Sequence, residues 1–273
     1  MAQNQDKEKV LKGVRDRYAG IVTADIGTAS CCGPGTSCCG PAAPGSVADP
    51  YAVSSFLGYN DEELAAAPEG ANLGLGCGNP QAIASLKAGE TVLDLGAGAG
   101  FDCFLAARGV GSSGSVIGVD MTPEMVSRAR ELARTHGCAH IDFRLGEIEH
   151  LPVADNTVDV IISNCVINLS PDKPAVFRDA LRVLKPGGRL AVSDVVATAE
   201  LPQEWLDDMQ MLSACVSGAA TVDEVEAMLA AAGFVDIDIR PKEESREFMR
   251  DWEPGTKIED YVLSASIQAV KPR

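Results

Sequence analysis

The stretch Thr91-Val-Leu-Asp-Leu-Gly-Ala-Gly-Ala-Gly100 decides the fold class of this chain. Its apolar start leads into three alternate glycines, Gly96, Gly98 and Gly100, and a helix-forming run follows at 101–107. This pattern predicts a buried strand, a tight turn and the N-terminus of a helix. The glycines let the backbone approach a ligand closely, and the free N–H groups of the helix can bind an anionic group. A glycine-rich turn also closes many strand–helix units for steric reasons alone.

An acidic residue after the next strand supports a ligand site. Residues 115–120 predict a second strand that ends in Asp120, 20 residues after Gly100, the separation at which a carboxylate commonly meets ribose hydroxyls. The spacing Gly-x-Gly-x-Gly differs from the dinucleotide pattern Gly-x-Gly-x-x-Gly, and the chain has no Gly-x-x-x-x-Gly-Lys-Ser/Thr motif for a nucleotide phosphate. S-adenosylmethionine fits best, because it carries a carboxylate, a ribose and an adenine but no phosphate.

Strand and helix patterns alternate five times along the chain. After the two strands above, further strands are predicted at 141–145, 157–163 and 189–194, with a turn at 185–188 before the last of these. This alternation predicts an α/β fold with a Rossmann-like, mostly parallel sheet and helices on both faces. Two final strands, 234–240 and 261–270, are expected to form an antiparallel pair at the edge.

The 273 residues are sufficient for one large domain with an appendage, and 46% of them are hydrophobic. We expect residues 1–50 to form an N-terminal helix followed by a cysteine-rich linker. Residues 51–195 are expected to form the cofactor-binding domain. Residues 196–273 are expected to pack on the same sheet, to contribute its closing strands and to help bind the acceptor.

The formal charge of −16 disfavours nucleic acid and anionic membrane surfaces as partners. We therefore expect a small substrate that is uncharged or cationic. No apolar run approaches the roughly 18 to 20 residues of a membrane span, and the N-terminus lacks the apolar region of a signal peptide. These features predict a cytoplasmic protein.

Nine cysteines are many for a reducing compartment, where structural disulfides are rare. Metal, metalloid or redox chemistry is therefore the leading explanation. The simpler alternative, that a cysteine is a small buried hydrophobic residue, is preferred for Cys103 and Cys138.

Four cysteines form two adjacent pairs, Cys31 with Cys32 and Cys38 with Cys39, in a stretch rich in Gly, Pro, Ser and Ala. Adjacent residues hold their Cα atoms about 3.8 Å apart, which hinders joint zinc chelation and strains a disulfide between neighbours. We favour an accessible thiol segment that binds a soft ion or exchanges disulfides. A zinc site and an inert linker are the alternatives.

Three further cysteines stand beside turns or strand ends. Cys77 is flanked by glycines, Cys165 follows the fourth strand and should face the glycine turn, and Cys215 ends a predicted helical stretch at 202–218. Three thiolates can hold a trivalent metalloid whose lone pair stays free. For Cys77, the alternative is a glycine-rich connector with an incidental cysteine.

At this point the chain resembles the arsenite S-adenosylmethionine methyltransferases. The resemblance covers about residues 50–240 and rests on these stretches: NLGLGCGNP (72–80), VLDLGAGAGFDCF (92–104), VIGVDMTPEM (116–125), FRLGEIEHLP (143–152), ISNCVINLSPDK (162–173), RVLKPGGRL (182–190) and CVSGA (215–219). The first and fifth are specific to this family, whereas the glycine turn is common to most methyltransferases.

The resemblance implies a class I methyltransferase fold, an S-adenosylmethionine cofactor and arsenite bound by Cys77, Cys165 and Cys215. It places Asp94, Gly96, Gly98 and Gly100 at the methionine end of the cofactor, Asp120 and Met121 at the ribose, and Glu147 and Ile148 beside the adenine. We also expect Asn164 to bind the cofactor. The family uses an additional N-terminal cysteine, which either adjacent pair could supply, and we favour Cys31 or Cys32 as this accessory or redox thiol.

The expected reaction is methylation of arsenite, or of its thiol conjugates, in arsenic detoxification. The arsenic lone pair attacks the sulfonium methyl group directly, so no general base is needed. If arsenic is left oxidised, Cys77 with Cys31 or Cys32 could reduce it, and thioredoxin or glutathione would regenerate the thiols. The alternatives are a methyltransferase for a small organic acceptor and a non-catalytic arsenic-binding protein.

Overall fold

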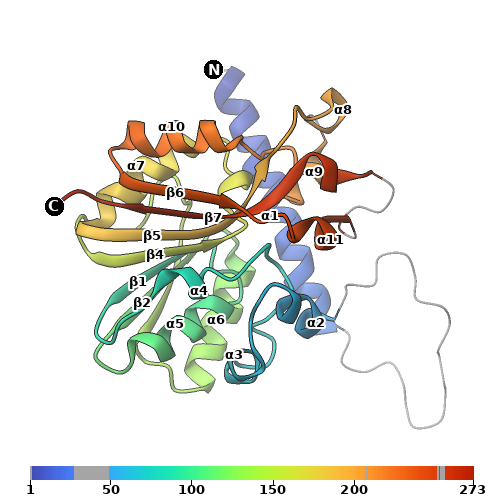
Figure 1. Ribbon diagram of the computed structural model, residues 1–273. Coiled ribbons are helices and arrows are strands. Elements are labelled where there is room, and N and C mark those ends of the chain that lie inside the picture. The colour runs from blue at the N-terminus through green and yellow to red at the C-terminus, as the bar shows by residue number, and fades with distance from the viewer. Residues whose placement is uncertain (1, 28–48, 207, 251, 253–255) are drawn as a thin grey trace, which may run out of the picture.

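The computed structural model describes residues 2–27, 49–206, 208–250, 252 and 256–273. These residues form a seven-stranded sheet in the order β3-β2-β1-β4-β5-β7-β6 (Figure 1). The strands are β1 (Thr91–Leu95), β2 (Ser115–Asp120), β3 (Ile141–Leu145), β4 (Val158–Asn164), β5 (Leu184–Ala197), β6 (Val235–Pro241) and β7 (Val262–Val270).

The sheet confirms the predicted fold class. Strands β1 to β5 pair in parallel, and β7 runs antiparallel to both β5 and β6. The last two strands therefore form the expected antiparallel pair at the edge, with β7 as the reversed strand. The carboxyl ends of the parallel strands meet at one edge, which is where ligands bind in sheets of this kind.

Strand β5 differs from the prediction of a turn at 185–188. It begins at Leu184, opposite Val158 of β4, and the next paired residue is Arg189, opposite Val160, so the ladder bulges between them. Pro186 cannot donate a ladder hydrogen bond, and Gly187 has a φ of +79°. The stretch thus deforms the strand instead of ending it.

Helices cover both faces of the sheet. On one face α5 (Phe101–Val110) and α6 (Pro123–Thr135) enclose a core that includes Val92 and Val116, and on the other α7 (Lys173–Val183) and α10 (Val222–Ala232) enclose a core that includes Leu93 and Leu95. Alternate residues of one strand point to opposite faces, so these buried runs fill two cores. The shorter helices are α2 (Pro50–Phe56), α3 (Asp61–Ala66), α4 (Gln81–Ala84), α8 (Gln203–Leu206), α9 (Met209–Ser213) and α11 (Ser245–Arg250). The single helical stretch predicted at 202–218 is therefore two short helices, α8 and α9.

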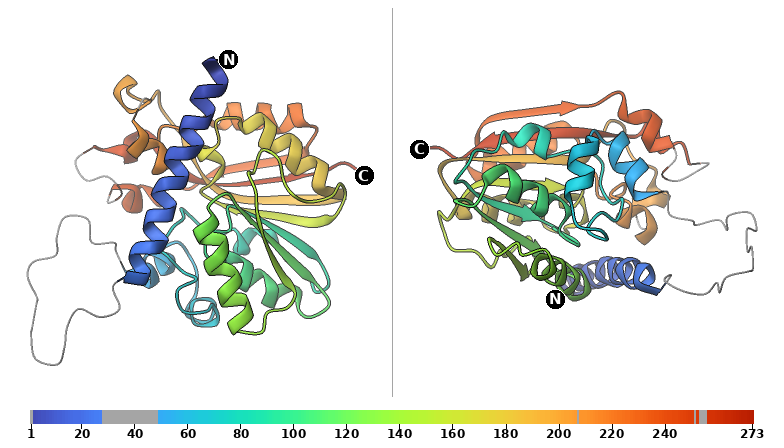
Figure 2. Two further views of the ribbon diagram at one scale, coloured as in Figure 1. Left: turned by 180° about the vertical axis from the view of Figure 1, so that it is seen from behind. Right: turned by 90° about the horizontal axis from the view of Figure 1, so that it is seen from below.

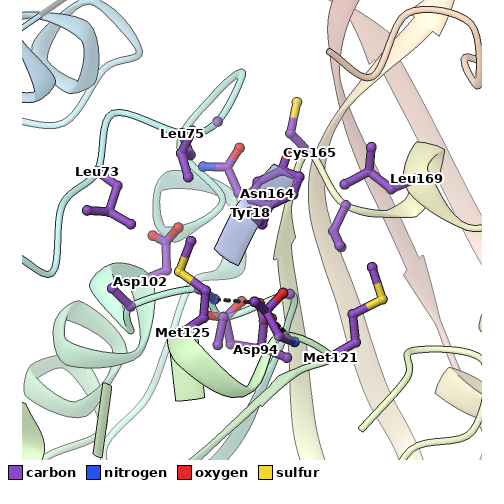
Figure 3. A pocket seen from close by; sticks show the side chains of 18 of the residues that line it. Tyr18, Leu73, Leu75, Asp94, Asp102, Met121, Met125, Asn164, Cys165 and Leu169 are labelled. Atoms are coloured by element: carbon purple, nitrogen blue, oxygen red, sulfur yellow. Dashed lines mark hydrogen bonds between the residues drawn. The ribbon is translucent and has the colours of Figure 1, made fainter. Parts of the chain in front are cut away.

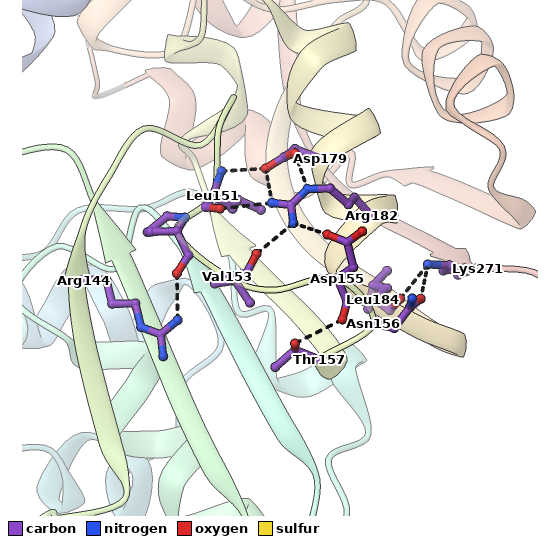
Figure 4. A network of polar contacts seen from close by, with 11 residues as sticks. Arg144, Leu151, Val153, Asp155, Asn156, Thr157, Asp179, Arg182, Leu184 and Lys271 are labelled. Atoms are coloured by element: carbon purple, nitrogen blue, oxygen red, sulfur yellow. Dashed lines mark hydrogen bonds and ion pairs between the residues drawn. The ribbon is translucent and has the colours of Figure 1, made fainter.

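The connection between β3 and β4 is held by Arg182 of α7 (Figure 4). Its guanidinium donates to the carboxylates of Asp179 and Asp155 and to the carbonyl oxygens of Leu151 and Val153, at 2.7–3.0 Å. A planar cation with several donors satisfies these backbone groups together. The segment that follows β3 is thereby tied to the core.

Helix α1 (Ala2–Gly27) is longer than predicted from the stripe at 4–18 and crosses the sheet at one end of its strands (Figure 2). It packs against α6 and α9, and Val14 and Val22 are buried, which confirms a docked helix. The cysteine pairs at 31–32 and 38–39 lie outside the described residues. The domain boundaries stay a prediction. Among the helices described, none is long and apolar enough to cross a membrane.

Candidate functional site

A cavity of about 1020 Å³, including its opening to solvent, lies at the carboxyl ends of β1, β2 and β4 (Figure 3). We call it the cofactor cavity. Eight of the residues predicted as site residues line it: Asp94, Gly96, Gly98, Asp120, Met121, Ile148, Asn164 and Cys165. The structure therefore gathers most of the predicted cofactor residues around one space, although their roles stay predictions.

The three glycines of the turn have different surroundings. All have a positive φ, of +68°, +53° and +96° for Gly96, Gly98 and Gly100. A Cβ on Gly98 would meet no atom within 4 Å and would project into open space, whereas one on Gly100 would lie 2.6 Å from the ring of Phe143. Gly98 thus keeps the cavity open, while Gly100, which does not line the cavity, permits close packing.

Asp120 is held by the glycine turn itself. Its carboxylate accepts hydrogen bonds from the backbone N–H of Gly98, at 2.9 Å, and of Thr122, at 2.8 Å. Burial raises its pKa, and these two bonds oppose that shift. The carboxylate is therefore fixed at the wall of the cavity, and its predicted contact with the ribose stays a prediction.

Two buried carboxylates lie at the other end of the turn. Burial, together with the charge of Asp102, raises the pKa of Asp94 well above its usual range. Burial raises the pKa of Asp102 to about 6. Both line the cavity, so a cationic group of a ligand would relieve the cost of keeping them ionised. The sequence analysis missed Asp102, although its place in the first turn of α5 after the glycines was a usable signal.

Of the two residues predicted to lie beside the adenine, Glu147 and Ile148, only one lines the cavity. Ile148 lines the cavity, but Glu147 does not; it is half-exposed and its carboxylate lies 3.5 Å from the guanidinium of Arg15 in α1. The neighbouring Glu149 lines the cavity instead, is buried and accepts a hydrogen bond from the Ser170 hydroxyl. Sequence analysis did not single out Glu149.

Next to the cofactor cavity, Cys77, Cys165 and Cys215 form a buried cluster that we call the thiol cluster. The sulfurs of Cys77 and Cys165 and a carboxylate oxygen of Asp194 all lie within 4.8 Å of one another. The Cys215 thiol donates to the carbonyl oxygen of Cys165 at 3.0 Å. Three segments that are far apart in sequence thus converge at this cluster. The sequence analysis did not predict that Asp194 of β5 also lies there.

Two of these cysteines have an unusual backbone conformation. Cys165 and Cys215 have φ values of +56° and +61°, in the left-handed region that residues with side chains rarely adopt. The turn at Cys165 is held by its N–H, which donates to the carbonyl of Ser193, and by the N–H of Ile167, which donates to Asp194. Such conformations cluster at functional sites, since surrounding contacts have to impose them.

Burial changes the acidity of several groups at the thiol cluster. Burial raises the pKa of Cys77, and burial together with the two neighbouring thiols raises the pKa of Cys165 well above its usual range. Burial also raises the pKa of the Asp194 carboxyl to about 6. Buried thiols of this kind stay protonated until a soft ion replaces the proton.

Helix α1 closes the cavity on one side, which the sequence analysis did not predict. Leu11, Val14 and Tyr18 line the cavity, and Tyr18 packs against both the thiol cluster and the apolar residues beside the glycine turn. The ammonium of Lys7 lies 2.7 Å from the carboxylate of Asp172, which ties the helix to the start of α7.

Comparison with known proteins places the chain in a family. A model of the methyltransferase domain matches residues 86–233. The arsenite methyltransferase of Halobacterium salinarum is 52% identical over all 273 residues, and the match covers 69% of that protein. The chain belongs to the arsenite methyltransferase family. This member is 29% identical over 245 residues to the arsenite methyltransferase of Mus musculus, of which the match covers 60%, so it spans only part of the longer relatives.

Comparison with solved structures agrees with this family assignment. The crystal structure of an arsenic(III) S-adenosylmethionine methyltransferase from Chlamydomonas reinhardtii has a TM-score of 0.59 and 34% identity, with 83% of this chain and 75% of that chain covered. A phosphoethanolamine N-methyltransferase from Haemonchus contortus, at 20% identity and a TM-score of 0.60, shares the fold. This family member is thus a methyltransferase that uses S-adenosylmethionine. The open Gly98 face, Asp120 and the buried pair Asp94 and Asp102 fit that cofactor.

Proposed function

We propose that this methyltransferase transfers the methyl group of S-adenosylmethionine to trivalent arsenic held by the thiol cluster. The observation that carries the proposal is the convergence of Cys77, Cys165 and Cys215 directly beside the cofactor cavity, with Cys165 belonging to both. The names of the relatives, arsenite methyltransferases, support the choice of acceptor.

Arsenite can exchange its hydroxyl groups for the thiols without a general base. Each thiol of the cluster gives its proton to one hydroxyl of arsenous acid, water leaves and an As–S bond forms. The arsenic stays trivalent and keeps its lone pair. Burial raises the pKa of the Cys77 and Cys165 thiols, so these two exchange as neutral groups and no charge has to leave the site with their protons.

When bound, the cofactor supplies an electrophilic methyl group on a sulfonium sulfur. In this proposal the thiol cluster would present the arsenic lone pair to that methyl group, Asp120 and Asp102 would orient the donor from the cavity wall, and α1 would cover the cavity. Orientation of this kind can recover roughly 7 to 11 kcal/mol of a barrier. Transfer formally oxidises arsenic from the trivalent to the pentavalent state, so a thiol reductant such as thioredoxin or glutathione supplies two electrons before release. Cys77 with Cys31 or Cys32 is the proposed dithiol of that step, and arsenic detoxification in the cytoplasm is the proposed role.

The test is to incubate the protein with arsenite, S-adenosylmethionine and glutathione, and to separate the arsenic species. Methylated arsenic is expected, and Cys165→Ser should reduce its formation more than about 100-fold, because loss of even an outer partner of a bound ion costs 10- to 100-fold. Cys138→Ser is the matched control, since Cys138 lies in the turn between α6 and β3 and outside the thiol cluster. Arsenite binding without methyl transfer, or full activity of Cys165→Ser, would contradict the proposal.

A further inference from the structure

One buried tyrosine has no part in the mechanism above. Tyr59 lies between α2 and α3 and is 3% exposed. Its hydroxyl donates to the carboxylate of Asp102, at 2.8 Å, and accepts a hydrogen bond from the amide nitrogen of Asn164, at 3.2 Å. Asp102 and Asn164 both line the cofactor cavity. Tyr59 therefore joins the helix that begins at the glycine turn to the end of β4.

Asn164 continues this connection to the thiol cluster. Its amide nitrogen also donates to the carbonyl oxygen of Gly78 at 2.8 Å, and its amide oxygen accepts from the backbone N–H of Cys77 at 3.0 Å. A Cβ on Gly76 would lie 2.8 Å from the same amide nitrogen. The loop that carries Cys77 thus wraps closely around one side chain.

The direction of these hydrogen bonds follows from the chemistry of each group. An ionised carboxylate only accepts, so the Tyr59 hydroxyl donates to Asp102 and its oxygen is free to accept from Asn164. The amide nitrogen of Asn164 then faces Tyr59, and the amide oxygen faces the N–H of Cys77. Without the tyrosine hydroxyl, the amide loses one of the partners that fix its orientation.

We propose that Tyr59 is a positioning residue for methyl transfer, which sets Cys77 relative to the bound cofactor by holding Asn164. The inference rests on the proposed function, because it concerns the distance between the cofactor and the thiol cluster. A cationic amino group beside Asp102 favours the ionised carboxylate and strengthens its bond with Tyr59. Binding of the cofactor thereby stiffens the Cys77 loop.

The loop has a second anchor that keeps the effect of Tyr59 moderate. The Ser264 hydroxyl of β7 donates to the carbonyl oxygen of Cys77 at 2.6 Å, so the loop stays attached when the tyrosine hydroxyl is removed. The ring of Tyr59 also packs edge-on against Phe101, with centroids 5.0 Å apart. Tyr59→Phe keeps this contact and removes only the hydroxyl.

The chain offers a matched control for this variant. The hydroxyl of Tyr51 also donates to an aspartate, Asp61, at 2.8 Å, but on the exposed surface. Single-turnover methylation of arsenite should fall about tenfold in Tyr59→Phe, because small misplacements of reacting groups are costly. Affinity for S-adenosylhomocysteine should change less than about threefold, and Tyr51→Phe should match the unaltered protein. Equal rates in the two variants, or a loss of affinity as large as the loss of rate, would overturn the inference.

A second measurement needs no arsenic. The rate at which iodoacetamide alkylates Cys77, followed by mass spectrometry with S-adenosylhomocysteine bound, should rise several-fold in Tyr59→Phe and stay unchanged in Tyr51→Phe. An unchanged rate in Tyr59→Phe refutes the positioning role, whatever the turnover. If the unaltered protein methylates no arsenite, the proposed function fails, while the alkylation rates still decide the role of Tyr59.

Discussion

The two halves of the site are built in different ways. The glycine turn at the centre of the cofactor half is local: the bond from Gly98 to Asp120 joins residues 22 apart, within one strand–helix–strand unit. The thiol half is not, since the bonds that hold Cys77 reach Asn164, 87 residues away, and Ser264, 187 residues away. A local unit survives changes elsewhere in the chain, whereas the thiol half depends on the packing of the whole domain.

The two halves should therefore be separable by mutation, and this is the largest effect we expect. Gly98→Val places a β-branched side chain at a positive φ and into the cavity, and should weaken binding of S-adenosylhomocysteine more than about 30-fold while leaving arsenite binding intact. Cys215→Ser should do the reverse, with arsenite affinity more than about 100-fold lower. Titration calorimetry measures the affinity of each variant for S-adenosylhomocysteine and for arsenite. If either variant weakened the binding of both ligands equally, the two halves of the site would act as one unit.

The cofactor half should also respond to pH on its own. Because the pKa of Asp102 is about 6, the carboxylate is ionised above that pH, and in our proposal it would then attract the cationic amino group of the ligand. Affinity for S-adenosylhomocysteine should thus fall as the pH drops through 6, and Asp102→Asn should remove that step. Binding curves between pH 5 and pH 8 provide the check. A step that persists in Asp102→Asn would assign it to another group.

Gly98 and Gly100 allow a comparison between a glycine that lines the cavity and a glycine that packs against the core. Gly100→Ala meets the ring of Phe143 at 2.6 Å and requires a φ of +96°, so it should lower the free energy of unfolding by about 2 kcal/mol. Gly98→Ala, with open space around its Cβ, should cost only the backbone term of about 1 kcal/mol. Urea unfolding of the two variants compares these costs. Equal losses would show that the clash with Phe143 is relieved by movement.

The smallest effect is expected for the ion pair that attaches α1. Lys7→Ala removes an ion pair whose side chains are 41% and 33% exposed, so stability should change by no more than about 1 kcal/mol. Val14→Ala, which truncates a side chain buried beside the thiol cluster, should cost more, about 1 to 3 kcal/mol. Thermal unfolding separates the two. A larger loss in Lys7→Ala would mean that charge rather than apolar contact docks the helix.

Prediction from the sequence succeeded where the signal is periodic or closely spaced. The glycine turn, Asp120 and the alternation of strands were readable because neighbours in sequence are also neighbours in space. Cys77, Cys165 and Cys215 were selected by chemistry and by resemblance, and the structure brings them together. Their role in binding arsenic stays a prediction.

What could not be predicted depends on contacts between distant segments. Asp194 and Asp102 look like ordinary strand-end and helix-start acids, and Tyr59 looks like a loop residue, until folding buries all three. Glu149, which accepts a hydrogen bond from Ser170, lines the cavity, whereas Glu147 lies beside Arg15 of α1. Nothing local to residues 147–149 encodes the position of α1.

The sequence alone therefore determined the order of strands and helices, the cofactor turn and the types of side chain available, because those follow from periodicity and from the conformational freedom of glycine. Only the tertiary structure decided which carboxylates are buried, which thiols share one cluster and which helix covers the cavity. The reason is physical: burial and proximity are properties of the packed chain, and packing against segments more than a hundred residues away changes the chemistry of each side chain.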